Sequence, residues 1–107
     1  MNTQLLVAGG GIGGLAAALA GARAGWTVDL VERAGEFTEV GAGIQIGPNV
    51  VRILNQWGLD RELGDVAAFP SDLQVCSATS GEVLGALRLG DRARSLYGAA
   101  YATIHRA

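Results

Sequence analysis

The 107-residue chain contains no lysine, one cysteine and one histidine. A single cysteine cannot close an internal disulfide, and metal sites need several sulfur or imidazole ligands, so we exclude a disulfide scaffold and a metal centre. All eight basic residues are arginines, scattered from Arg23 to Arg106, and the net charge is −2. Nucleic-acid binding uses a basic surface that releases counterions, so we also exclude nucleic acid as a main partner.

Long apolar runs and export signals are absent as well. The apolar stretch at residues 12–22 ends at Arg23, short of the ~20 residues that cross a bilayer. Residues 1–4 carry no basic region of the kind that begins a signal peptide. We therefore expect a cytoplasmic protein with no membrane contact. Half of the residues are apolar, a globular composition that allows one small core.

The first 33 residues predict a β-α-β unit. The short apolar run at residues 4–8 is typical of a strand buried on both faces, as in parallel sheets. The alanine-rich residues 12–24 predict a helix of little bulk, and Gly25 is suited to end it. The β-branched residues in 27–31 predict a second strand.

A glycine-rich motif joins the first strand to the helix. Gly9, Gly11 and Gly14 form the pattern G-x-G-x-x-G. In this pattern the first glycine makes a tight turn, the second lets the backbone approach a pyrophosphate, and the third lets helix and strand pack closely. The phosphates would meet the free N–H groups and positive dipole end of the helix, at Gly11, Ile12 and Gly13.

Glu32 ends the predicted second strand. It lies near the ~20-residue spacing after Gly9 at which an acid accepts hydrogen bonds from ribose hydroxyls. A carboxylate there repels a 2′-phosphate, which disfavours an NADP-type adenosine. The order of strand, turn, helix, strand and acid favours a dinucleotide site over a glycine-rich loop without a ligand. A second register, Gly11-x-Gly13-x-x-Ala16, begins only after the strand has ended, so we prefer the first.

The remainder of the chain predicts a loop at residues 34–43, a helix and a hairpin. Gly47-Pro48 opens the helix, since proline at the first helical position has a preset φ and loses no needed N–H. Residues 73–78 and 83–89 flank a turn-forming segment and predict an antiparallel hairpin. Cys76 in its first strand is expected to be a small buried hydrophobe. The expected buried stripe of the helix consists of Val50, Ile53, Leu54 and Trp57.

Three blocks of sequence resemble known flavoproteins. The glycine motif, extended by Ala18, Gly25, Val28 and Glu32, resembles the N-terminal FAD fingerprint of flavoprotein oxidoreductases. Residues 41–49 (GAGIQIGPN) and the helix after them resemble group A flavin monooxygenases of the salicylate and hydroxynicotinate hydroxylase type. Residues 97–107 (YGAAYATIHRA) resemble the segment that leads into an arginine-containing helix of that family.

The resemblance implies an α/β fold, with a Rossmann-like FAD-binding β-α-β unit from an incomplete doubly wound sheet and a small antiparallel hairpin. Residues 1–107 would form the N-terminal part of an FAD-binding domain. Residues 1–33 would be the β-α-β unit, 34–72 the flavin-proximal loop and helices, and 73–107 the hairpin and the start of the arginine-containing helix. The missing C-terminal part of the same enzyme would supply the other strands, so we expect no hydroxylase activity from the chain alone.

The activity implied is that of an FAD-dependent monooxygenase, which uses NADH or NADPH and oxygen to hydroxylate a small aromatic substrate. By the same resemblance, Glu32 would hold the adenosine ribose and Arg33 would border the adenine-side pocket. The backbone at Ala42 and Gly43 would approach the flavin, and Arg106 would contact the FAD.

Gln45 lies in the flavin-proximal block, where hydroxynicotinate-type relatives can carry histidine. An amide cannot act as a general base near neutral pH, which excludes a histidine-assisted proton transfer from this position. Gln45 can still orient a substrate oxygen by hydrogen bonding. Tyr97 and Tyr101 are candidates for a substrate pocket, with packing as the default interpretation, and His105 is a weaker candidate for an acid–base group.

Two alternatives remain open. One is an NAD-dependent dehydrogenase, whose sequence usually continues into another β-α-β unit rather than into a block such as residues 41–49. The other is a truncated, non-enzymatic domain that binds nucleotide weakly or not at all.

Overall fold

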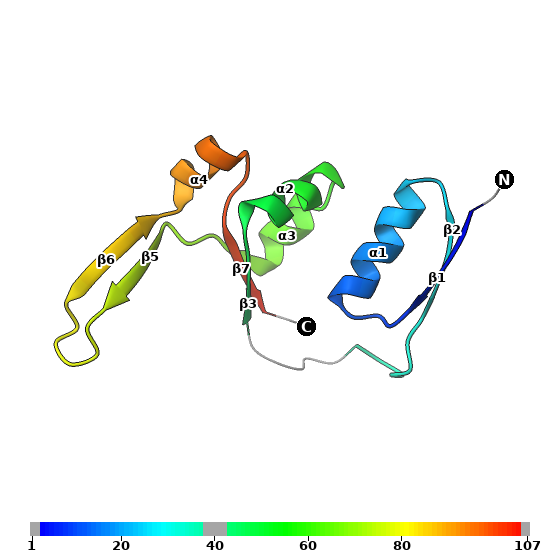
Figure 1. Cartoon of the computed structure of the whole chain (residues 1–107), viewed down its shortest axis with the longest axis horizontal. Coiled ribbons are helices and arrows are strands. Elements are labelled where there is room, and N and C mark those ends of the chain that lie inside the picture. Colours follow the sequence, from blue (N-terminus) through cyan, green and yellow to red (C-terminus); the bar gives the residue numbers. More distant parts are fainter. Residues whose placement is uncertain (1–2, 38–42, 106–107) are drawn as a thin grey trace. The chain divides into compact units, whose positions relative to one another are not determined.

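The computed structural model describes residues 3–37 and 43–105. The chain divides into two compact units, Met1–Thr38 and Glu39–Ala107. The first unit contains strand β1 (Gln4–Ala8), helix α1 (Ile12–Arg23) and strand β2 (Thr27–Val31) (Figure 1).

In the first unit, β1 and β2 pair in parallel, with Leu5 opposite Val28. Gly21 brings α1 close to both strands: a Cβ at this position would lie 2.9 Å from Leu5 Cδ2 and 3.2 Å from Val28 Cγ2. Gly25 then reverses the chain with a φ of +84°, a conformation that costs glycine little. The helix and both strands agree with the expected positions to within one residue.

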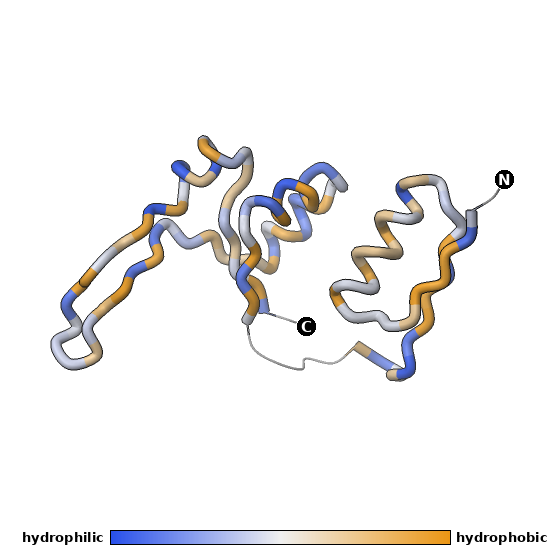
Figure 2. Tube along the Cα trace, viewed as in Figure 1, coloured by the Kyte–Doolittle hydropathy of each residue, from blue (hydrophilic) through white to orange (hydrophobic). Residues whose placement is uncertain are grey.

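The prediction that the first strand is buried on both faces is wrong. Val7 is buried, whereas Leu6 is 68% exposed and Val31 is 54% exposed. The reason is that α1 covers one face of this two-stranded sheet, and no other described element of the unit covers the second face. Figure 2 shows that apolar residues are concentrated along β1 and β2.

The second unit is built on a three-stranded antiparallel sheet with the strand order β3-β7-β4. Its core contains Val51, Leu63, Ala99 and Ala102, with Ile46, Leu54, Ala67 and Ile104 packed against them. Alternate residues of a strand point to opposite faces of the sheet. The core therefore covers the face that carries Ile46, Ala67, Ala102 and Ile104, and the other face lies away from this core. The elements are β3 (Gly43–Ile46), α2 (Pro48–Gln56), α3 (Asp60–Val66), β4 (Ala67–Ala68) and β7 (Ala102–His105).

Helix α2 begins at Pro48 as expected, but the predicted buried stripe is partly wrong. Val51 is only 2% exposed, whereas Val50 and Ile53 are 38% and 43% exposed. Leu54 does pack against the core. The apolar residues of α2 span a wide arc, and packing against α3, β3 and the later helix at residues 90–97 buries the part of it that contains Val51 and Leu54.

Strands β5 (Asp72–Cys76) and β6 (Val83–Arg88) pair antiparallel around a turn that contains Gly81 at a φ of +73°. Every residue of both strands is exposed. Cys76 is therefore exposed, contrary to the expectation of a buried side chain. The reason is that a lone two-stranded hairpin has no second layer to cover it.

Helix α4 (Gly90–Tyr97) follows the hairpin and ends at Gly98, which has a left-handed φ of +77°. No helix was predicted at these residues from the sequence. Ala102–His105 then form strand β7, within the segment that was expected to lead into an arginine-containing helix. Arg106 and Ala107, where that helix would start, lie outside the described residues.

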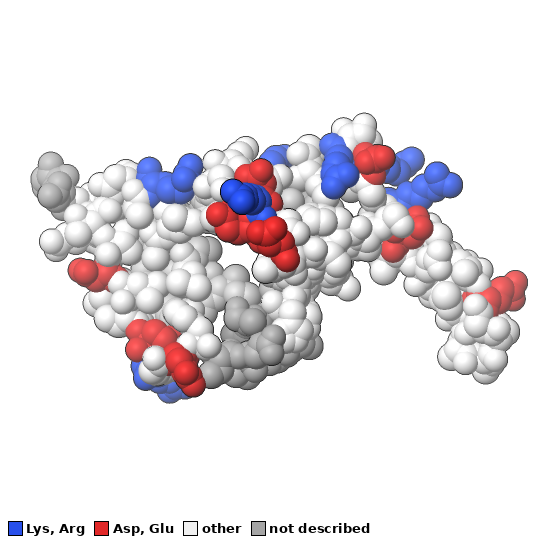
Figure 3. Space-filling view, turned by 180° about the vertical axis from the view of Figure 1, so that it is seen from behind, with Lys and Arg blue, Asp and Glu red and all other residues white. Residues whose placement is uncertain are grey.

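Arginine and acidic side chains are interspersed on the face shown in Figure 3. An ion pair joins Arg94 Nη1 and Asp91 Oδ1 in α4, 3.4 Å apart. Among the described residues, no helix is long and apolar enough to cross a membrane. The same part of the chain holds no group of three or more His, Cys, Asp or Glu residues that could bind a metal ion.

Candidate functional site

The glycine turn ties the end of β1 to the end of β2. Gly9 has a φ of +119°, a conformation that favours glycine, and its N–H donates a hydrogen bond of 2.7 Å to the Val31 carbonyl. This bond extends the parallel pairing by one residue beyond the strands. The turn therefore begins at the carboxyl edge of the sheet, where open α/β sheets bind ligands.

Gly14 packs the first turn of α1 against this loop. A Cβ at Gly14 would lie 1.9 Å from the Gly9 carbonyl oxygen and 3.4 Å from Val7 Cγ1. The first distance is far below any contact that carbon and oxygen can make, so a side chain at this position requires the backbone to move. The close packing predicted for the third glycine of the motif is thus present.

Gly11 and Gly13, unlike Gly14, have free space beside their Cα atoms. A Cβ at either position would meet no atom within 4 Å. Gly11 caps α1 without any side-chain hydrogen bond, so the first N–H groups of the helix, from Ile12 onward, have no partner from a capping side chain. Open space in front of free N–H donors at a positive helix end fits a phosphate group.

Glu32 reaches back from the end of β2 to the glycine turn. Its Oε2 accepts a hydrogen bond of 2.6 Å from the Gly10 N–H, and its Oε1 accepts one of 3.0 Å from the Ala34 N–H. A carboxylate has about four acceptor positions, so both oxygens can accept further bonds. Beside it lies a pocket of about 470 Å³, lined by Ala8, Gly9, Val31, Glu32 and Arg33.

The role of Gly10 was not predicted from the sequence. Gly10 is buried, and a Cβ there would lie 3.0 Å from Phe37 Cε1 and 3.2 Å from Glu32 Oε2. A side chain would compete with the Glu32 carboxylate for its place against the turn. The available signal was a run of three glycines whose middle residue, Gly10, occupies a position that the G-x-G-x-x-G pattern leaves free.

These hydrogen bonds predict a pH dependence of stability. Donation from the Ala34 N–H, and then from the Gly10 N–H, lowers the pKa of Glu32 below its ordinary value of 4.5. A carboxyl with a depressed folded-state pKa stabilises the fold above its unfolded-state pKa, and this stabilisation is lost as the pH falls through the folded-state pKa. We expect the melting temperature of Glu32→Gln to fall less steeply than that of the wild type below pH 4.5. Parallel melting curves for the two proteins would contradict this expectation.

Two further predicted residues, Gly43 and Gln45, lie on β3 in the second unit. The Tyr101 hydroxyl donates a hydrogen bond to Gln45 Oε1, which links the loop before β7 to β3. The sequence analysis named both residues but did not pair them. Ala42 and Arg106, the other two residues predicted to contact the cofactor, lie outside the described residues.

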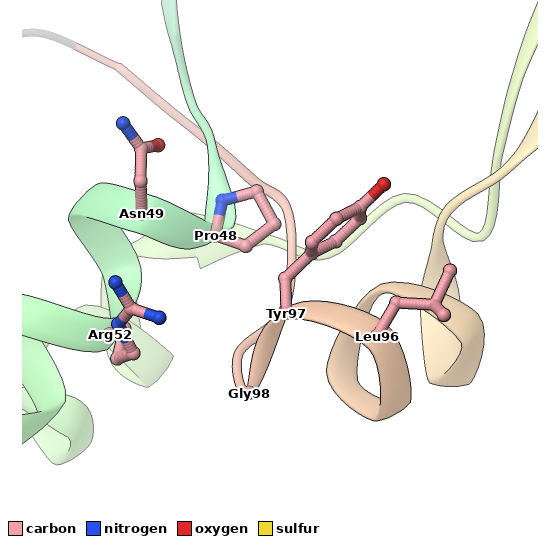
Figure 4. A pocket seen from close by; sticks show the side chains of 6 residues that line it. All are labelled: Pro48, Asn49, Arg52, Leu96, Tyr97 and Gly98. Carbon is pink, nitrogen blue, oxygen red and sulfur yellow. The ribbon is translucent and has the colours of Figure 1, made fainter.

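A larger pocket, of about 600 Å³, lies between α2 and α4. Figure 4 shows that Asn49 and Arg52 project from α2, whereas Leu96 and Tyr97 project from α4. Of these four, the sequence analysis named only Tyr97 as a candidate for a substrate pocket. None of the residues predicted to contact the cofactor lines it; the lining residues are Pro48, Asn49, Arg52, Leu96, Tyr97 and Gly98.

Comparison with known proteins places these features in a family. The profile of the FAD binding domain family matches residues 2–95. The chain is 42% identical over 105 residues to a 3-hydroxybenzoate 6-hydroxylase of Polaromonas naphthalenivorans, and this match covers 98% of the chain. It is 43% identical over 103 residues to a 6-hydroxynicotinate 3-monooxygenase of Bordetella bronchiseptica, covering 96% of the chain.

The alignments cover 26% and 27% of these two relatives, so the chain spans about a quarter of their length. Among solved structures, HpxO of Klebsiella pneumoniae in complex with FAD and uric acid matches 97% of the chain, with a TM-score of 0.80 and 26% identity. That match covers 26% of the HpxO chain. The family profile matches well over half of the sequence, and the chain therefore belongs to the FAD binding domain family.

Proposed function

We propose that the chain is the FAD-binding start of a monooxygenase that hydroxylates a small aromatic substrate with NADH or NADPH and oxygen. The observation that carries this proposal is the hydrogen bond from the Gly10 N–H to Glu32, which holds the acid beside the open N-terminus of α1. The relatives named for 3-hydroxybenzoate and 6-hydroxynicotinate supply the substrate class.

In this proposal the adenosine half of FAD binds to the first unit. Its pyrophosphate lies against the backbone of Gly11, Ile12 and Gly13, which the tight Gly9 turn and the close packing of Gly14 leave open. Its ribose hydroxyls donate hydrogen bonds to the acceptor positions of Glu32 that Gly10 and Ala34 leave free. Arg33, in the same pocket, borders the adenine. The volume of this pocket, about 470 Å³, falls within the range of ligand sites and also supports the proposal.

The flavin half is proposed to approach the backbone at Ala42 and Gly43 and to contact Arg106. Gln45 is proposed to donate a hydrogen bond to a substrate oxygen. FAD supplies the redox chemistry and the reaction with oxygen. The contribution of this chain is to bind and orient the cofactor.

We further propose that β1-α1-β2 is the first part of a doubly wound sheet, completed by strands elsewhere in a longer protein. The uncovered face of β1 and β2 supports this, because Leu6 and Val31 on it are more than half exposed. The exposed α1 residues Ile12 and Leu15, at 53% and 47%, support it as well. In the same proposal residues 1–33, 34–72 and 73–107 keep the roles expected from the sequence.

The proposal is tested on the full-length protein. We expect the purified protein to carry a yellow flavin, and NADH or NADPH consumption to rise when an aromatic acid such as 3-hydroxybenzoate is added. Mass spectrometry would then detect a product that has gained one oxygen atom. A colourless protein that binds NAD and cannot be reconstituted with FAD would instead support a dehydrogenase. Expression of this chain alone is the control, since we expect it to produce no hydroxylated product.

A further inference from the structure

One face of the β3-β7-β4 sheet is open. The register places Gln45 opposite Thr103 and Thr103 opposite Ala68, so these three residues form a row across the strands. Their neighbours Ala67 and Ile104 pack against the core on the other face. Gln45 and Ala68 are exposed, so the described part of the second unit leaves this face uncovered.

A hollow of about 300 Å³ lies on the same sheet. Its lining combines small or apolar groups with the polar side chains of Thr103 and His105, and its residues are Gly43, Val66, Ala68, Thr103, Ile104 and His105. Gln45 is not one of the lining residues, but it is paired directly with Thr103, which is. The volume is at the lower end of the range for small-molecule pockets, about 300 Å³ to 1,000 Å³.

The Gln45 amide is held by Tyr101. The Tyr101 hydroxyl donates to Gln45 Oε1, so one of the two acceptor positions of the amide oxygen is filled, while Nε2 with its two N–H donors takes no part in this bond. The terminal torsion of a glutamine is soft, and an exposed amide can turn either its oxygen or its nitrogen toward a ligand. The hydroxyl of the half-buried Tyr101 selects one of these orientations.

We propose that Tyr101 is a positioning residue, which fixes the Gln45 amide so that Nε2 donates a hydrogen bond to a hydroxyl or carboxylate oxygen of an aromatic ligand at this face. This inference rests on the proposed function for its substrate class and adds a residue that determines affinity. Val66 and Ala68 offer the ring an apolar surface, and the fixed amide recognises its oxygen.

Three variants of the FAD-loaded full-length protein test this role, with 3-hydroxybenzoate and 6-hydroxynicotinate as probes and the flavin absorbance as the signal. Tyr101→Phe is expected to raise Kd by about 3-fold to 10-fold, the value of one neutral hydrogen bond. Gln45→Glu keeps an acceptor for Tyr101 but removes both N–H donors, so we expect a rise of about 10-fold to 100-fold. Tyr101→Phe combined with Gln45→Ala is expected to bind no more weakly than Gln45→Ala alone, because the hydroxyl acts through the amide.

Two controls separate positioning from folding. FAD affinity and melting temperature are expected to stay at wild-type values in Tyr101→Phe, and Gln74→Glu, the same change on the exposed strand β5, is expected to leave Kd unchanged. If Gln45→Glu binds the probes as tightly as the wild type, the amide donates no bond to the ligand and the inference is wrong. Additive effects of the Tyr101 and Gln45 changes would also overturn it.

Failure of the proposed function has a different signature. If the wild-type protein binds FAD but neither probe, the ligand part of this inference is overturned while the proposed cofactor stands. If the protein binds no FAD, the proposed function itself fails. In either case the side-chain amide resonances of Gln45 report on the pairing, because Tyr101→Phe shifts them only if the hydroxyl holds the amide in solution.

Discussion

Replacing Gly14 with alanine is expected to abolish FAD binding and to destabilise the FAD-free protein by about 3 kcal/mol, the upper end of the usual cost of overpacking. The new Cβ would lie 1.9 Å from the Gly9 carbonyl oxygen. Its neighbour is backbone, so no change of side-chain rotamer can relieve the clash. The turn or the helix must shift, and either movement displaces the N–H groups proposed to hold the pyrophosphate. Urea unfolding without cofactor and a fluorescence titration with FAD measure the two effects.

Gly13→Ala is the matched control for stability. Gly13 is the neighbouring residue in the same turn of α1, and a Cβ there meets no atom within 4 Å. Alanine also has the higher helix propensity, so we expect the FAD-free protein to gain about 0.5 kcal/mol. Equal stability of the two variants would show that the close contact of Gly14 with Gly9 does not constrain the fold.

Replacing Glu32 with glutamine is expected to weaken FAD binding by about 10-fold to 100-fold, the value of a hydrogen bond to a charged group. Both carboxylate oxygens accept backbone hydrogen bonds, from Gly10 and from Ala34. Glutamine has a single acceptor oxygen, so its NH₂ group would face one of these N–H donors. The side chain would then leave its place beside the turn, and the proposed ribose acceptor would be lost. Isothermal titration with FAD measures the change.

Glu36→Gln provides the control for net charge. Glu36 lies in the same exposed segment as Glu32, and its replacement by glutamine removes the same negative charge. We expect this variant to bind FAD as the wild type does. Equal losses in the two variants would mean that the general negative charge of the loop, and not the geometry of Glu32, determines FAD affinity. Retention of full affinity in Glu32→Gln would contradict the proposed ribose contact.

Local sequence determined the first unit well, because its signals act over few residues. Gly9, with its positive φ, and Gly14, with no room for a side chain, sit where the glycine pattern requires them. Pro48 likewise opens α2 through its own fixed torsion. Each of these features depends on backbone sterics of the residue itself or of its immediate neighbours, which a sequence pattern records directly.

Tertiary structure decided which faces of the strands and helices are buried. The apolar residues of β1 predicted burial on both sides, yet Leu6 is 68% exposed because α1 covers a single face. The buried stripe predicted for α2 included Val50, but Val50 is 38% exposed and its neighbour Val51 is buried in the core instead. Cys76 is exposed because no described element covers its hairpin. Burial depends on which elements meet, and propensity and periodicity along the chain do not encode that.

The contacts of the candidate site show the same division. The sequence alone predicted the glycine turn and the acid at the end of the second strand, and it named Gln45 as a candidate residue. Only the folded chain brings the Gly10 N–H to Glu32, 22 residues apart, and the Tyr101 hydroxyl to Gln45, 56 residues apart. Long-range hydrogen bonds arise from strand pairing, in β1 with β2 and in β3 with β7, and the residue types by themselves do not specify which partners the pairing brings together.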